Sequence, residues 1–159
     1  MIQQDNILLP AFIFDLDGVL ANNSQRQHLL QRSGDTKPSR QDWLDFFNAS
    51  PLDGVYSDTA KLFKTLQAAG YKILICTGRS EDYEEMTRDW LESWGLLPDQ
   101  LFQRRHLDFR KDFEVKEEIY LTQIQPYYQV LGVFEDRADC VRMWRARELT
   151  CYQPREASY

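Results

Sequence analysis

The sequence predicts an α/β fold, a five-stranded parallel sheet with helices on both faces. Short apolar runs alternate with amphipathic helical patterns from residue 71 onward, which is typical of βαβ units. Three of the runs end abruptly in polar or charged residues, as buried parallel strands do where they leave a sheet. The length of 159 residues suits one ordinary domain, so we expect a single domain over residues 1–159.

Five runs are predicted as strands. The clearest are residues 11–15 (AFIFD), 71–76 (YKILIC) and 130–134 (VLGVF), because each is mainly apolar and short. Residues 101–103 and 150–153 are weaker candidates. Ligands of open α/β sheets bind at the carboxyl ends of the strands. We therefore expect the polar residues that follow the three clear strands to converge.

Helical patterns lie between the strands. Apolar residues recur at helical spacing over residues 57–69, 81–94, 111–124 and 138–146. The stretch 21–51 interrupts the alternation, is polar, and is expected to hold two short helices, near 25–31 and 41–47. We interpret this stretch as a small cap-like insertion over the carboxyl edge of the sheet rather than as a domain.

Composition excludes several classes of protein. With 43% hydrophobic and 28% charged residues, the chain is predicted to fold. The net charge of −6 excludes the broad basic field of a general nucleic-acid binder and leaves room only for a local site. Three cysteines without a CxxC spacing argue against a disulfide framework or a zinc site. The start, MIQQDNILLPAFIFDLDG, predicts neither a signal peptide nor a membrane span, so we expect a cytoplasmic protein without membrane partners.

Two carboxylates, Asp15 and Asp17, follow the first strand. A carboxylate can attack phosphorus as a nucleophile, and a neighbouring one can serve as general acid and base. A cation would offset their repulsion from a phosphate, and Gly18 would let the chain turn sharply beside them. The alternative is a solvated acidic turn. Because an apolar strand directly precedes the acids, the functional interpretation is favoured.

A second and a third signal come later in the chain. Thr77, followed by Gly78 and Arg79, could bind phosphoryl oxygens, or the three could form a plain strand-to-helix turn. Lys116 could neutralise a phosphoryl group, or it could belong to a charged helix face.

The fourth signal is an acid pair, Glu135 and Asp136, directly after the third clear strand. Their oxygens suit Mg²⁺, although an acidic N-cap of the next helix would have the same pattern. The sequence alone does not decide whether Glu135 or Asp139 adds to metal binding.

The order of these signals resembles that of the haloacid-dehalogenase-like (HAD) phosphohydrolases: an Asp pair, a strand-end Thr or Ser, a Lys and a strand-end acid pair. The stretches MTRDW, RKDFEVKEEIY and EDRADCVRMW are similar to the 3′-phosphatase half of bacteriophage polynucleotide kinase/phosphatase. The similarity covers most of the chain. It implies a Rossmann-like HAD fold with a minimal cap, Mg²⁺ as cofactor, and a phage-encoded protein that acts in the host cytoplasm.

The resemblance also implies catalytic roles. Asp15 is expected to be the nucleophile that forms an aspartyl-phosphate, and Asp17 the general acid and base. Thr77 and Lys116 would bind the transferring phosphoryl group. The Mg²⁺ ion would be held by Asp15, the backbone carbonyl of Asp17, and Asp136.

Four further residues are expected to serve the substrate. Arg26 and Arg79 match arginines that contact substrate in the family, and Gly78 would bind substrate through its backbone. Asp112 matches an important acid and is expected to orient Lys116.

Two departures from the family pattern stand out. Val19 occupies the place of a Thr, and Glu135 replaces an Asp of the acid pair. No GxxxxGK[ST] sequence occurs, so the kinase half is expected to be missing and the protein to remove phosphate. The short cap segments imply an open site for a polymer end, which favours a phosphorylated nucleic-acid 3′ end as substrate.

Two alternative functions stay open. One is a phosphatase for free nucleotides or other small phosphomonoesters. The other is a catalytically inactive HAD domain that acts as an interaction module, although the presence of both Asp15 and Asp17 argues against it. The sequence indicates neither the oligomeric state nor a preference for DNA or RNA.

Overall fold

The structure is a computed structural model that describes residues 7–32 and 36–157. The first six residues, part of the segment in which no signal peptide is expected, lie outside these ranges. Among the described helices, none combines the length and the apolar character needed to cross a membrane.

Five parallel strands form the central sheet, in the order β5-β4-β1-β6-β7. In the middle, β1 (Leu9–Phe14) pairs with β4 (Lys72–Ser80) on one side and β6 (Tyr128–Phe134) on the other. The edges are β5 (Gln100–Arg104) and β7 (Cys151–Tyr152). This sheet confirms the predicted fold class, and each strand overlaps a predicted run.

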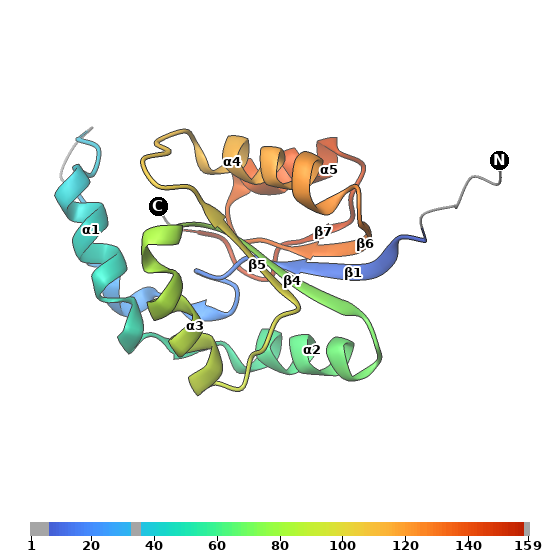
Figure 1. Cartoon of the computed structure of the whole chain (residues 1–159). Helices are drawn as coiled ribbons and strands as arrows, with labels where there is room; N and C mark the ends of the chain where they lie inside the picture. Colours follow the sequence, from blue (N-terminus) through green and yellow to red (C-terminus); the bar gives the residue numbers. More distant parts are fainter. Residues whose placement is uncertain (1–6, 33–35, 158–159) are drawn as a thin grey trace.

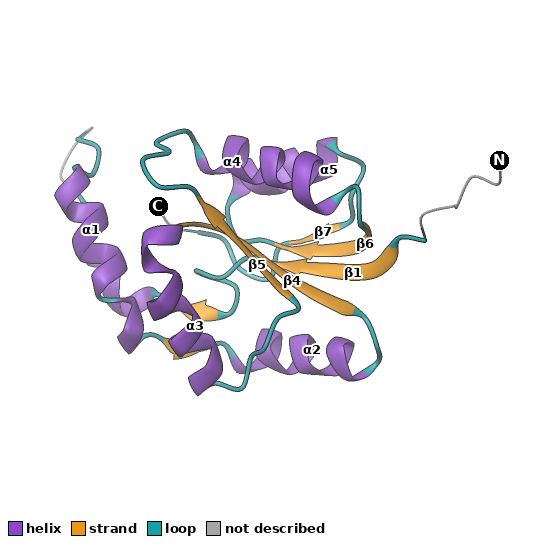
Figure 2. Ribbon diagram, in the orientation of Figure 1, coloured by secondary structure: helices purple, strands orange, loops and turns teal. Residues whose placement is uncertain are grey.

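Helices cover both faces of the sheet, as Figures 1 and 2 show. One face carries α4 (Asp112–Ile119) and α5 (Ala138–Ala146), and the other carries α2 (Ser57–Ala68) and α3 (Glu84–Ser93). All four overlap predicted helices. The predicted helix 111–124 is wrong in detail, because a π-helical turn over Tyr120–Ile124 follows α4.

The alternation of side chains along β1 divides the core into two layers. Ala11 and Ile13 pack with Trp144 of α5 on one face. Phe14 packs with Phe63 of α2 on the other, with ring centroids 5.4 Å apart. Buried on both faces, β1 holds the residue after it, Asp15, in a fixed place at the carboxyl edge.

The insertion forms a small cap. A two-stranded antiparallel ribbon, β2 (Ala21–Asn22) with β3 (Gly54–Val55), closes its base. Between these strands lie a 3-10 helix (Ser24–Leu29) and α1 (Arg40–Asn48), near the two predicted short helices. Figure 1 shows α1 beside the end of the sheet toward which the strands point. The ribbon itself was not predicted.

Candidate active site

The carboxyl edge brings together acids that are far apart in the sequence. Asp15 follows β1, and Glu135 and Asp136 follow β6. One carboxylate oxygen from each of the three lies within 4.8 Å of the others, and all three residues are buried. Glu135 therefore belongs to the cluster. Asp139, the other residue left open by the sequence, instead pairs with Arg137 at 3.0 Å.

This acidic cluster suits a hard cation. The buried Oδ1 of Asp136 has no hydrogen-bond partner in the described part of the chain, and a buried polar atom without a partner is unfavourable. Burial, followed by the charge of Glu135, raises the pKa of Asp15 well above its usual value and that of Asp136 to about 7. Mg²⁺ binds such oxygens, and its positive charge would oppose both shifts by stabilising the ionised carboxylates.

Lys116 lies fully buried among three carboxylates. Its Nζ is 2.8 Å from Glu135, 3.1 Å from Asp15 and 3.2 Å from Asp112. Burial alone would lower the pKa of this ammonium group, but the three acids raise it well above the usual value. The lysine is thus charged at neutral pH and lies directly beside the carboxylate expected to be the nucleophile.

The side chain of Asp17 is directed toward two arginines rather than toward the acidic cluster. It forms ion pairs with Arg79, at 2.6 Å, and with Arg26. Burial pushes the pKa of Asp17 upward, but the charges of Arg79 and Arg26 outweigh it and lower the pKa to about 2. Asp17 is therefore ionised in the free protein, and the expected contribution of its backbone carbonyl to metal binding stays a prediction.

Arg26 is completely buried, and its guanidinium is surrounded by protein. It donates to both carboxylate oxygens of Asp53, at 2.7 to 3.0 Å, and to the carbonyl of Phe46, at 3.1 Å. Its guanidinium also lies 4.0 Å from the centre of the Phe46 ring. Direct contact of Arg26 with substrate stays a prediction, whereas its contact with Asp17 is present. Asp53 belongs to no motif, so sequence reasoning missed it.

Thr77, Gly78 and Arg79 lie within β4, which runs on to Ser80, so the turn considered at this point is wrong. The buried Thr77 hydroxyl accepts a hydrogen bond from the Arg79 N–H at 3.2 Å. Ser80 is the N-cap of the 3-10 helix that follows, Glu81–Tyr83, and its Oγ accepts a hydrogen bond from the Asp82 N–H at 3.2 Å.

Two glycines allow a close approach in the site. A Cβ on Gly18 would lie 2.0 Å from an oxygen of Asp136, and Gly18 also has a φ of +84°. A Cβ on Gly78 would lie 1.8 Å from an oxygen of Asp112. Both distances are far below van der Waals contact, so only glycine fits at these two positions without displacing the neighbouring acid.

Gly78→Ala should therefore disturb the site. The new methyl group must displace Asp112, which pairs with Lys116, and overpacking of this kind costs about 1–3 kcal/mol. We expect a lower melting temperature and a fall in kcat. Gly54→Ala is the matched control, because a Cβ there meets nothing within 4 Å. Unchanged phosphate release by Gly78→Ala would contradict the proposed closeness of the two residues.

A cleft of about 540 Å³ opens from the carboxyl edge, with Asp15, Asp17 and Thr77 among its lining. One wall comes from α1 of the cap and from Tyr83. The other comes from Arg104 at the end of β5 and from the segment between β5 and α4, residues 105–111. The cap therefore borders the site without enclosing it.

A five-stranded parallel sheet with this set of acids and a buried lysine at its carboxyl edge defines a HAD-like phosphohydrolase. Within that class, residues 9–159 match the family of the polynucleotide kinase PNKP phosphatase domain. The chain belongs to this family and is a phosphatase.

The relatives are larger proteins. A chain in the structure of the Pnkp1/Rnl/Hen1 RNA repair complex is 30% identical, with a TM-score of 0.78 over 98% of this chain and 45% of that one. A protein of Autographa californica nuclear polyhedrosis virus, described as a bifunctional polynucleotide kinase/RNA ligase, is 30% identical over 137 residues, 85% of this chain and 18% of its own length. The chain thus spans less than half the length of these relatives.

More distant structures share the fold alone. A haloacid dehalogenase-like hydrolase from Streptococcus pneumoniae has a TM-score of 0.64 at 15% identity, covering 91% of this chain and 84% of its own. The class C acid phosphatase from Bacillus anthracis has a TM-score of 0.68 at 16% identity, covering 96% of this chain and 68% of its own.

Proposed function

We propose that this phosphatase is Mg²⁺-dependent, acts through an aspartyl-phosphate on Asp15, and removes the terminal phosphate from a nucleic-acid 3′ end. One observation carries the proposal. A buried carboxylate, Asp15, lies within 4.8 Å of two further acids and 3.1 Å from the buried Lys116, next to an open cleft. Such a group meets the needs of nucleophilic attack on a phosphate anion.

In the first step, an Asp15 oxygen attacks phosphorus and the bond from phosphorus to the sugar oxygen breaks. Lys116 and the Thr77 hydroxyl stabilise the phosphoryl oxygens as charge shifts to the leaving group. Mg²⁺, held by Asp15, Asp136 and the Asp17 carbonyl with Glu135 beside them, would offset the charge of substrate and nucleophile. The leaving sugar oxygen takes a proton from Asp17.

In the second step, Asp17 takes a proton from water, the water oxygen attacks phosphorus, and the bond to Asp15 breaks to release inorganic phosphate. An acid with a pKa of about 2 is ionised at neutral pH, so its contact with the arginines must weaken, and Asp17 must take up a proton from solvent, before the first proton transfer. We propose that the incoming phosphate draws Arg79 away from Asp17, because a dianion competes for the same guanidinium.

The shape of the site supports a polymeric substrate. The cap contributes only part of the lining of the cleft, through α1. Residues 104–111, which do not belong to the cap, also line it. A chain of nucleotides can leave such a cleft, whereas a closed cap would enclose a small metabolite. The family and the RNA repair complex in which one relative occurs favour the same substrate class.

A substrate panel tests this proposal. A 3′-phosphorylated oligonucleotide should have a kcat/KM about tenfold or more above that of p-nitrophenyl phosphate, since one base stack contributes about 1–3 kcal/mol. EDTA should abolish turnover and Mg²⁺ restore it, and Mg²⁺ should also raise the melting temperature by neutralising the acids around Asp136. If the protein prefers 3′- or 5′-mononucleotides, its substrate is a free nucleotide and not a nucleic-acid end. Full activity in excess chelator would exclude the mechanism.

A further inference from the structure

An exposed aromatic ring stands on one wall of the cleft. Phe109 lies in the segment between β5 and α4 and lines the cleft, yet 77% of it is exposed. Its neighbour Leu107 is 58% exposed and has a φ of +57°, a conformation that a leucine rarely adopts. Exposed apolar residues and backbone strain in one short segment at a ligand site indicate a binding role.

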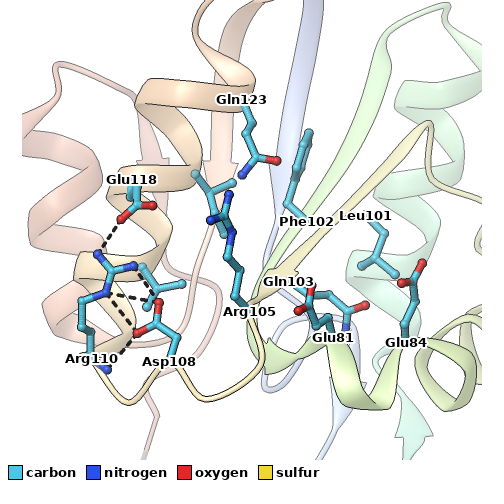
Figure 3. Close-up of a pocket in the computed structure, with 12 residues that line it drawn as sticks. Glu81, Glu84, Leu101, Phe102, Gln103, Arg105, Asp108, Arg110, Glu118 and Gln123 are labelled. Atoms are coloured by element: carbon cyan, nitrogen blue, oxygen red, sulfur yellow. Dashed lines mark hydrogen bonds and ion pairs between the residues drawn. The ribbon is translucent and has the colours of Figure 1, made fainter.

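The segment is held in place by Arg104, so the ring is presented by an anchored backbone. The Arg104 guanidinium donates to the carbonyls of Asp108, at 3.0 Å, and Arg110, at 2.7 Å, which flank Phe109. Its Nε donates to the Gly78 carbonyl at 2.8 Å, which ties the segment to the catalytic strand β4. Behind the segment, Arg110 also bridges Asp108 and Glu118 (Figure 3).

The part of the cleft that the cap contributes is aromatic as well. Trp43 and Phe47 of α1 stack with centroids 5.9 Å apart, and Phe47 meets Tyr83 at 5.4 Å. All three rings line the cleft and stay partly exposed. Their contacts fasten the cap to the catalytic domain and at the same time present flat apolar faces to a ligand.

Two cations accompany these rings. Arg40 at the start of α1 and Lys111 at the start of α4 line the cleft and are exposed. Neither forms an ion pair with any residue that the structure describes. The Lys111 ammonium lies 5.9 Å from the centre of the Phe113 ring, a contact that leaves its charge unneutralised. A surface that combines aromatic faces with cations that lack an acidic partner is complementary to single-stranded nucleic acid, which carries bases and phosphates in turn. A small phosphomonoester would leave this outer surface unused.

We propose that the cleft is a base-stacking site for a single-stranded 3′ end, in which Phe109 stacks on one of the last two bases. This inference rests on the proposed function, because the terminal phosphate is placed at Asp15. Arg40 and Lys111 meet the backbone phosphates of the same strand. The site thus selects a strand end by its bases without hydrogen-bonding to them, and it accepts any sequence.

The test separates stacking from charge. The substrate is a 3′-phosphorylated trinucleotide, compared with versions in which a tetrahydrofuran abasic residue replaces the last or the penultimate nucleotide. In the wild type, one of these replacements should lower kcat/KM about tenfold, the effect of losing one stacked base. Phe109→Ala should lower kcat/KM for the intact substrate about tenfold too. The abasic replacement should then lower kcat/KM of this variant little further.

Two controls make the result specific. Phe109→Tyr keeps a flat ring and should restore the rate, whereas Tyr127→Ala removes a ring that is 59% exposed before β6, at the other end of the sheet, and should change nothing. The stacking site is overturned if neither abasic substrate loses rate or if Phe109→Ala loses the same factor on all substrates. In that outcome Asp15-dependent phosphate release from oligonucleotides would persist, so the proposed function would still stand.

Discussion

Asp15→Asn should abolish phosphate release and leave a folded protein. An amide cannot form the aspartyl-phosphate, so turnover should fall by roughly 10⁴-fold or more, the scale on which loss of a covalent nucleophile acts elsewhere. Acid-quenched wild-type protein should retain labelled phosphate, and the variant should not. Asp89→Asn, on the exposed side of α3, is the control for the substitution itself.

Stability distinguishes this variant from an unfolded one. The pKa of Asp15 is raised in the folded state, so its ionisation opposes folding at every pH above its unfolded value of about 3.9. Replacing it with a neutral amide removes this cost, and Lys116 keeps Glu135 and Asp112 as partners. In metal-free buffer at pH 8, the variant should melt at or above the wild-type temperature. A folded Asp15→Asn protein with ordinary turnover would exclude Asp15 as the nucleophile.

Lys116→Met should be the most destabilising single change in the site. It leaves Asp15, Asp112 and Glu135 buried without their shared counter-charge, and breaking a buried pair costs about 3–5 kcal/mol. For a chain of this size, each kcal/mol of lost stability lowers the melting temperature by roughly 2–4 °C. Activity should be lost as well, because the buried ammonium group that stabilises the transferring phosphoryl group is then missing.

The destabilisation should depend on pH. The lysine pKa is raised in the folded state, so its stabilising charge is fully present at neutral pH and is lost only above its unfolded value of about 10.4. In the variant, Asp136, whose pKa is raised to about 7, takes up a proton as the pH falls below that value. The pKa of Asp15 is also raised well above its usual value, which favours its neutral form at lower pH. Urea titrations should thus show a larger defect at pH 8 than at pH 5. Equal stability of Lys116→Met and the surface variant Lys61→Met at pH 8 would refute this account.

The large elements of the fold were predictable because they bury long apolar patterns. The runs that became β1, β4 and β6 are apolar and stop at acids or at Thr77, so both the strands and the catalytic edge could be located. The ribbon of β2 and β3 could not be, since two-residue strands are too short to show alternation.

The candidate site was predictable where a residue directly follows a strand, and less so where a contact closes across the fold. The sequence placed Asp15 and Asp136 at the same edge but left the place of Glu135 undecided, because the packing of the strands settles which acids lie in one cluster. Asp53 carried no signal at all, as its partner Arg26 lies 27 residues away. Phe109 was not singled out either, because exposure of a side chain at a cleft depends on the tertiary structure.

The pairing of Arg26 with Asp53 also bears on how the cap can be exchanged in evolution or design. Arg26 is inside the insertion and Asp53 is at its end, and together they fix the acid of the catalytic turn, Asp17. The insertion is therefore not an independent module: a foreign cap grafted between β2 and β3 would remove Arg26, one of the two arginines that pair with Asp17. A replacement cap would have to bring an arginine and an aspartate together to keep the ion pairs around Asp17.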